Sequence, residues 1–170
     1  ETKTTKFQDV QVRQALMYAL DREAIVENIY FGYAEVAVGT IPTMSWAANA
    51  KGIKPELRYD YDVDTAKKLL DEAGWAPGAD GVRAKDGQRL SFTMYGIGGN
   101  NIHIQMLQAM QEYWKVVGVE MTPQPEPFQQ LVSRITETFD FETFLVGFGW
   151  DATPDQSAMW ACDSYKAGFN

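Results

Sequence analysis

Apolar positions near the amino end of the chain recur every three to four residues, which is the spacing of amphipathic helices. The pattern predicts one helix over residues 10–20, with Asp9 as its N-terminal cap. It predicts a second helix over residues 22–31, which Asp21 caps and Gly32 ends. Two short helices joined this tightly indicate a structural helical hairpin.

A third helix is predicted over residues 63–73, between Asp62 as cap and Gly74 as terminator. Its apolar residues fall at i, i+3, i+4 and i+7. The preceding residues, 33–61, have no clear period, and they contain Trp46 in a Pro-containing extended segment. We expect Trp46 either to face a ligand cleft or to fill the core, with the core interpretation slightly favoured.

Further along, strand-like and helix-like segments alternate. Asp86-Gly87 between two strand-like runs predicts a two-residue hairpin. The segments that follow are expected to be a strand over 89–95, a helix over 102–117, a strand over 119–124, a helix over 128–138 that starts at Pro127, and a strand over 142–148. Because β-α-β crossovers are nearly always right-handed and join parallel strands, the expected fold is α/β, with a three-stranded parallel β-α-β-α-β core plus a hairpin strand, preceded by helices.

The last predicted strand, residues 142–148, is apolar enough to be buried on both faces. It leads into a loop that carries Trp150, Asp151 and Asp155. Open α/β sheets bind ligands at the carboxyl ends of their strands, so this loop is predicted to form one wall of a ligand cleft. Trp150 could stack on a ligand or pack in the core, and the sequence leaves both open. The two carboxylates could hold a ligand ammonium group or act as a catalytic pair.

The loop after residues 89–95 should emerge at the same edge of the sheet. Its sequence, GIGGNN over residues 96–101, lacks both the P-loop lysine and the dinucleotide-binding spacing, which favours a plain strand-to-helix turn. A weaker hypothesis is that Tyr95 or Asn100 lines the shared cleft. The single histidine, His103, is expected to be solvent-facing or helix-terminal rather than catalytic.

Composition narrows the class of protein. The 170 residues suffice for one domain, and 45% hydrophobic residues are typical of a globular protein. A net charge of -8 argues against nucleic acid as a partner, because phosphate binding needs clustered Lys and Arg. One cysteine gives no disulfide framework, and no metal-ligand spacing or cofactor motif is present. Both ends of the chain read as cut from a longer protein.

Three segments together resemble the family 5 extracellular solute-binding proteins of ABC transporters, the dipeptide and oligopeptide-binding type. They are FQDVQVRQAL at 7–16, YDVDTAKKLLDEAGW at 61–75 and FDFETFLVGFGWDATPD at 139–155. The resemblance covers nearly the whole chain in family order. It implies that residues 1–170 are a single α/β lobe, the second lobe of a two-lobed periplasmic-binding-protein type II architecture whose other lobe and returning segment lie elsewhere.

In peptide-binding members of that family, an aspartate shortly after the Gly-Trp pair receives the α-amino group of the ligand. Asp151 and Asp155 are both candidates here, because the spacing is shorter than in the family pattern. Some oligopeptide binders carry an arginine in the strand before Gly-Trp. This chain has Val146-Gly147-Phe148 there, so that carboxylate anchor is missing.

The sequence therefore predicts a receptor without catalysis and without a cofactor, which binds short peptides or another small solute and presents them to an ABC permease in the membrane. The expected location is extracytoplasmic, periplasmic or lipid-anchored, and the expected state is monomeric. An oligosaccharide receptor is the alternative within the family. A hydrolase using Asp151 and Asp155, or a purely structural module, are alternatives of other classes.

Overall fold

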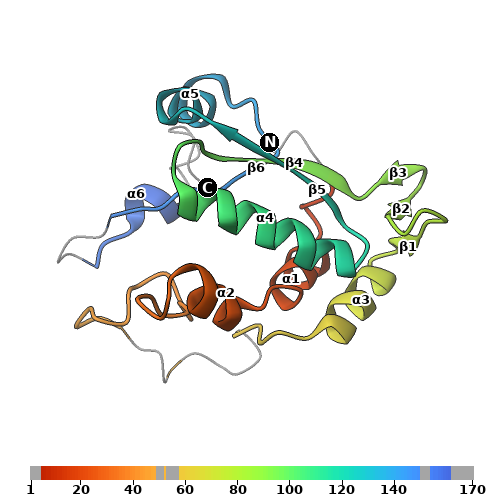
Figure 1. Ribbon diagram of the computed structural model, residues 1–170. Coiled ribbons are helices and arrows are strands. Elements are labelled where there is room, and N and C mark those ends of the chain that lie inside the picture. The colour runs from red at the N-terminus through yellow and green to blue at the C-terminus, as the bar shows by residue number, and fades with distance from the viewer. Residues whose placement is uncertain (1–4, 49–51, 53–57, 150–153, 162–170) are drawn as a thin grey trace.

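The computed structural model describes residues 5–48, 52, 58–149 and 154–161. Helices lead, a small antiparallel sheet follows, and a parallel sheet flanked by helices completes the chain (Figure 1). The elements are α1 (Val10–Tyr18), α2 (Arg22–Ile29), α3 (Val63–Glu72), β1 (Ala76–Pro77), β2 (Arg83–Lys85), β3 (Gln88–Arg89), β4 (Ser91–Ile97), α4 (Asn101–Val116), β5 (Glu120–Glu126), α5 (Phe128–Ser133), the π-helix η3 (Arg134–Thr138), β6 (Thr143–Phe144) and α6 (Ser157–Trp160).

The first three helices begin where the sequence predicts, because an aspartate caps each of them. Each carboxylate accepts a hydrogen bond from a backbone N–H of the first turn. Gln11 N–H donates to Asp9 at 2.8 Å, Ala24 N–H to Asp21 at 2.9 Å and Thr65 N–H to Asp62 at 2.9 Å. These bonds satisfy donors that a helix cannot pair internally. The caps therefore set the start of α1, α2 and α3.

The Asp62 cap predicts an acid dependence of stability. Hydrogen bonds from the Thr65 backbone and hydroxyl hold the pKa of Asp62 below its usual range. The stabilisation is therefore complete above the pKa of an unfolded aspartate, and it is lost as the pH falls through the lower folded pKa. We expect Asp62→Asn to lose less melting temperature on acidification than the unsubstituted protein, measured by circular dichroism from neutral pH to about pH 3. The control Asp64→Asn, on the same exposed turn, should behave like the unsubstituted protein, and equal slopes for all three proteins would contradict the prediction.

The predicted hairpin is confirmed, whereas the strand that follows is divided. Asp86 and Gly87 have φ of 51° and 79°, the left-handed values that a tight two-residue turn requires at both positions. The run 89–95 does not form one strand, because β3 belongs to the antiparallel sheet and β4 to the parallel one. Between them, buried Leu90 donates its N–H to the Arg83 carbonyl at 2.8 Å and accepts from the Glu120 N–H at 3.0 Å. The chain changes sheet at this residue.

The predicted parallel core is confirmed. The sheet has the order β5-β4-β6, with both neighbours parallel to β4. The β4–β5 register runs from Ser91↔Glu120 to Ile97↔Glu126. The crossover from β4 to β5 and the crossover from β5 to β6 run in opposite directions across the sheet. Because both are right-handed, α4 covers one face of the sheet and α5 lies over the opposite face (Figure 1).

The prediction of a long last strand, buried on both faces, is wrong. Only Thr143–Phe144 form β6, and Phe148 is 44% exposed. The reason is position: β6 is an edge strand that pairs with β4 alone within the described residues. The predicted helix 128–138 is also modified, since Pro127 is its cap and its last five residues form η3, which ends at left-handed Phe139.

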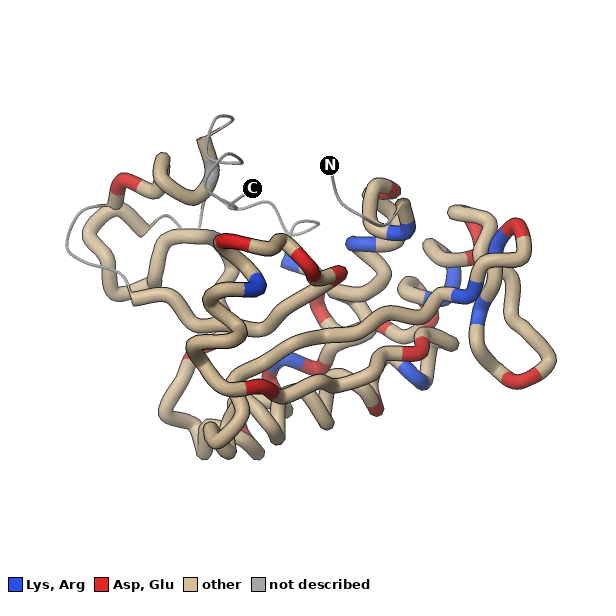
Figure 2. The backbone as a smooth tube through the Cα atoms, turned by 90° about the horizontal axis from the view of Figure 1, so that it is seen from above, with Lys and Arg blue, Asp and Glu red and all other residues tan. Residues whose placement is uncertain are grey.

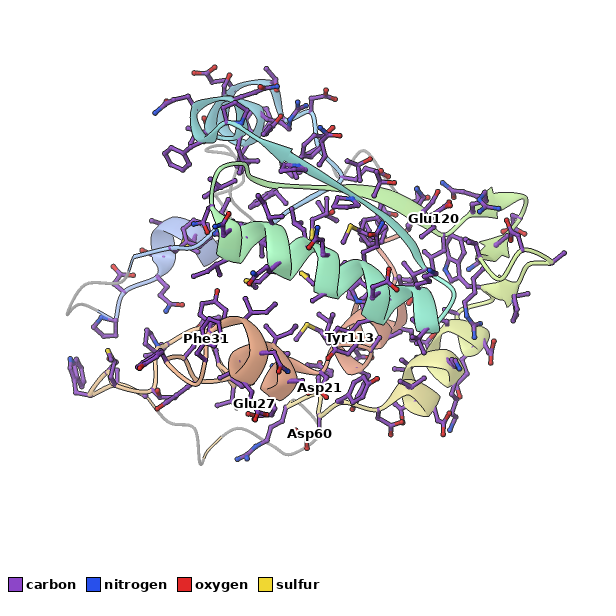
Figure 3. All side chains as sticks on the ribbon, in the orientation of Figure 1. Asp21, Glu27, Phe31, Asp60, Tyr113 and Glu120 are labelled. Carbon is purple, nitrogen blue, oxygen red and sulfur yellow. The ribbon has the colours of Figure 1, made fainter. Side chains whose placement is uncertain are left out.

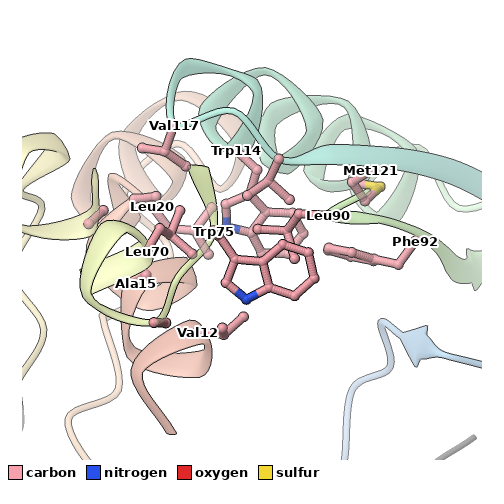
Figure 4. Close-up of a cluster of buried hydrophobic side chains, with 14 of the residues drawn as sticks. Val12, Ala15, Leu20, Leu70, Trp75, Leu90, Phe92, Trp114, Val117 and Met121 are labelled. Carbon is pink, nitrogen blue, oxygen red and sulfur yellow. The ribbon is translucent and has the colours of Figure 1, made fainter. Parts of the chain in front are cut away.

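The core lies between the helical layer and one face of the parallel sheet. Side chains from α1, α3, α4, β4, β5 and the residues next to them meet there, as Figure 4 shows: Val12, Ala15, Leu20, Leu70, Trp75, Leu90, Phe92, Trp114, Val117 and Met121. Trp114 also donates its indole N–H to the Leu16 carbonyl at 2.9 Å, which joins α4 to α1. On the sheet side, a Cβ on Gly96 would lie 2.8 Å from Leu107, so glycine permits the close approach of α4.

Candidate ligand-binding site

The carboxyl ends of β4 and β6 lie at the same end of the molecule as the amino terminus of α4 and helix α6 (Figure 1). The Leu145 N–H donates to the Tyr95 carbonyl at 2.7 Å, so the two strands remain joined up to this edge. Open α/β sheets bind ligands outside the carboxyl ends of their strands. This edge is therefore the candidate site, as the sequence predicts.

The Gly-rich loop after β4 is a strand-to-helix turn, which confirms the favoured interpretation. The Asn100 side-chain oxygen caps α4 by accepting the N–H groups of Ile102 at 3.0 Å and His103 at 3.2 Å. The Gly98 N–H donates to the Glu126 carbonyl at 2.7 Å, which ties the loop to the end of β5. Asn100 thus uses its oxygen within the fold, and its amide N–H groups are what it can offer to a ligand.

His103 lies in the first turn of α4 and is half-buried. Its Nδ1 is buried, with no hydrogen-bond partner in the described part of the chain. No nucleophile or carboxylate is placed against it by a hydrogen bond, and the described residues contain no group of three side chains that could hold a metal ion. The helix-terminal placement predicted for His103 is therefore confirmed.

Tyr95 lies against a charged pair that the sequence pattern did not predict. The Arg134 guanidinium lies 4.1 Å from the centroid of the Tyr95 ring and donates to both Glu126 carboxylate oxygens, at 2.9 and 3.0 Å. It also donates to the Asp140 carbonyl at 2.9 Å and to its carboxylate at 3.3 Å. A signal was present, because Arg134 stands on the apolar stripe of its helix with Leu131 and Ile135, where a charge needs a partner.

The Glu126–Arg134 pair sets the charge at this edge. The Glu126 side chain is 5% exposed and that of Arg134 18%, and hydrogen bonds from Arg134 to Glu126 raise the pKa of the guanidinium further. The guanidinium therefore stays charged, and both of its bonds to Glu126 are charge-assisted. Arg134 is thus committed to carboxylates of the chain and does not stand ready to take the carboxylate of a ligand.

Asp155 lies just before α6 and keeps a charged carboxylate at the surface. It is exposed, and its carboxylate accepts the Ser157 N–H at 2.9 Å. That bond holds the pKa of Asp155 below its usual range, so the group is anionic at neutral pH. The two other residues of the predicted loop site, Trp150 and Asp151, lie outside the described residues.

Trp46 is not part of the core, so the core interpretation that the sequence slightly favours is wrong. Its side chain is 82% exposed in the loop between α2 and α3. That loop reaches the same end of the molecule as α6, because Gln156 donates its side-chain N–H to the Thr40 carbonyl at 2.6 Å. Trp46 and Asp155 therefore belong to segments that are joined, although the structure records no contact between the two side chains.

The fold and the edge just described define an α/β unit with a candidate ligand site at the carboxyl ends of parallel strands. All 170 residues match one family, described as bacterial extracellular solute-binding proteins, family 5, middle region. The chain belongs to this family. None of the helices in the described ranges is long and apolar enough to cross a membrane.

Named relatives support the assignment. The chain is 34% identical over 170 residues to the oligopeptide-binding protein AppA of Bacillus subtilis, covering 99% of this chain and 31% of that protein. The solved structure of AppA from Bacillus subtilis with a nonapeptide superposes with a TM-score of 0.90 at 31% identity, over 100% of this chain and 35% of that one. The structure of lactococcal OppA, in the closed conformation with an endogenous peptide, superposes with a TM-score of 0.85 at 27% identity, over 98% of this chain and 32% of that one. The chain thus spans about a third of the length of these relatives.

Proposed function

We propose that the chain is one α/β lobe of a two-lobed receptor that binds short peptides between its lobes and delivers them to an ABC permease. The observation that carries the proposal is the superposition of the entire chain on a peptide-bound relative, with a TM-score of 0.90. The candidate edge supports it, since the carboxyl ends of β4 and β6 lie where such a ligand would enter. We further propose that the whole protein is extracytoplasmic and monomeric.

The proposed ligand anchors are the residues of the loop after β6. Asp155, and Asp151 beside it in sequence, would accept hydrogen bonds from the ligand ammonium group, and Trp150 would supply an apolar face. Tyr95 and Asn100 would line the facing side, with the Asn100 amide as donor. The engagement of Arg134 by Glu126 and Asp140 supports recognition of the amino end of the ligand rather than its carboxyl end.

The proposal gives the lobe no chemical step. The lobe binds a peptide and releases it, and closure around the ligand would create the surface that the permease binds. A catalytic pair is not supported by the described residues, since Asp155 hydrogen-bonds to the Ser157 backbone and its pKa is lowered, whereas a general acid needs a raised pKa.

The function is tested by calorimetry on the full-length protein with a short peptide bearing a free amino terminus. We expect Asp155→Asn to weaken binding by roughly tenfold or more, because a charge-assisted hydrogen bond contributes about 1.5–3 kcal/mol. N-acetylation of the peptide should weaken binding to the unsubstituted protein by a similar factor and should add little to the variant. Asp64→Asn, exposed on α3 far from this edge, is the matched control.

Two outcomes would change the proposal. If Asp151→Asn shows the loss and Asp155→Asn does not, the anchor is Asp151. If the full-length protein turns over a substrate and Asp155→Asn abolishes that turnover, the receptor function is wrong.

A further inference from the structure

The loop between α2 and α3 carries the most exposed apolar side chains in the described part of the chain. Four of its residues are more than three-quarters exposed: Phe31 at 76%, Tyr33 at 93%, Met44 at 94% and Trp46 at 82%. Every other exposed large apolar side chain there is at most 53% exposed. We call these four residues the apolar loop patch.

The first part of this loop, residues 31–48, is almost free of charge. Residues 31–48 contain one charged side chain, Glu35, whereas about a quarter of the residues in an average domain are charged. Glu35 itself is engaged within the loop, accepting the Thr43 hydroxyl at 2.6 Å. In Figure 2 the end of the molecule with this loop and α6 carries few charged positions compared with the end that holds β1, β2 and β3. A loop that contacts only solvent would normally carry more charged side chains than this one.

Contacts within the loop and with neighbouring elements hold the loop in a defined shape. Arg22 donates to the Ala37 carbonyl at 3.3 Å, Gln156 donates to the Thr40 carbonyl at 2.6 Å, and Ser45 N–H donates to the Pro42 carbonyl at 2.9 Å. Tyr33 and Met44 line one open hollow of about 700 Å³. Phe31 follows the end of α2 and lies beneath the amino-terminal part of α4 (Figure 3). The lobe therefore fixes this backbone while its apolar side chains face outward.

We propose that the apolar loop patch is the surface on which the other lobe of the same polypeptide seats when the protein closes. The inference rests on the proposed function, and it adds a particular surface to it. The patch lies at the ligand end of the lobe, joined to the segment after the candidate site by the Gln156–Thr40 bond. The relatives are about three times as long as this chain, and one of them is seen closed on its peptide, so polypeptide is available to cover the patch.

Two other occupants fit these observations less well. A peptide ligand brings polar main-chain groups and terminal charges, and residues 31–48, with one engaged carboxylate, offer few charged groups to pair with them. A second copy would carry the same net charge of -8, which opposes self-association. Another lobe of the chain can supply a fixed apolar counter-surface at no cost in translational entropy.

The test compares Met44→Glu with the control Val116→Glu in the full-length protein, using several peptides of different sequence and length. Both residues are apolar and exposed, but Val116 is at the far end of α4. Because a buried charge would oppose the closed state, we expect Met44→Glu to weaken binding of every peptide by the same factor, roughly tenfold or more. The melting temperature without peptide should stay unchanged, and Val116→Glu should bind normally.

The outcomes separate the alternatives. A loss that differs from peptide to peptide would place the patch, and Trp46 with it, against the ligand and overturn the inference. A concentration-dependent dimer in light scattering that Met44→Glu abolishes would assign the patch to a second copy. Normal binding by Met44→Glu overturns the inference while leaving the proposed function intact, whereas failure of the unsubstituted protein to bind any peptide overturns both.

Discussion

Replacing Arg83 with methionine is expected to lower the free energy of unfolding by about 3 kcal/mol. Arg83 is 4% exposed, and its guanidinium donates to two backbone carbonyls, that of Val117 at 2.8 Å and that of Trp75 at 2.6 Å. Methionine fills much of the space but provides no donor, so both carbonyls would lose their partner away from water. An unsatisfied buried acceptor costs about 1–3 kcal/mol. Urea unfolding monitored by tryptophan fluorescence measures the difference.

A matched variant separates the carbonyl contacts from the ion pair. Arg83 also pairs with Asp71, whose side chain is 58% exposed. Because exposed ion pairs contribute little, Asp71→Asn should cost less than about 1 kcal/mol. Arg83→Lys should fall between the two, since one ammonium cannot reproduce the two-armed geometry of a guanidinium. Equal losses for Arg83→Met and Asp71→Asn would contradict the assignment and give the stabilisation to the pair.

The environment of Arg83 also explains a glycine. Gly118 has a φ of 82°, and a Cβ on it would lie 2.9 Å from Arg83 Cγ and from the Gly81 carbonyl oxygen. The turn from α4 to β5 therefore needs glycine both for its left-handed backbone and for the room that Arg83 occupies. The sequence predicts the turn from the glycine, but it contains no local sign of the arginine packed over it, 35 positions earlier.

Features set by neighbouring residues could be predicted from the sequence. The aspartate caps, the Asp86–Gly87 turn and the helical periods depend on interactions within a few residues, and the structure confirms them. The parallel order also followed, because the handedness of crossovers leaves few alternatives. What failed depends on distant partners. An apolar run predicts a buried strand whether or not a further strand pairs with it. In the described part of the chain, β6 pairs with β4 alone.

The same limit applies to the candidate site. The strand ends and the Asn100 turn were located correctly, since strand-to-helix succession identifies the edge. The exposure of Trp46 was not predictable, because a lone tryptophan in an aperiodic stretch is equally compatible with a core and with a surface. The contact of Tyr95 with Arg134 brings together residues 39 positions apart across two elements, and only the apolar stripe of the predicted helix 128–138 indicated that Arg134 needs a partner.

Replacing Arg134 with methionine is expected to lower the free energy of unfolding by about 3 kcal/mol, because it leaves the buried Glu126 carboxylate without a counter-charge. Glu126 is 5% exposed, and Arg134 is its hydrogen-bonding partner through both oxygens. The variant also loses the guanidinium over the Tyr95 ring. Asp140→Asn serves as the control, since that side chain is 68% exposed and its loss should cost less than about 1 kcal/mol.

The double variant Glu126→Leu/Arg134→Met tests whether the ion pair itself stabilises the fold. Removing both charges removes their desolvation cost as well, so the double variant should regain most of the stability that Arg134→Met loses. Losses that simply add would show that each residue stabilises the lobe through separate contacts. In the full-length protein, a double variant that regains stability but binds peptides more weakly would assign a second role to the pair. Arg134 joins the end of β5 to the turn before β6 through Glu126 and Asp140, so it would then hold the shape of the ligand edge.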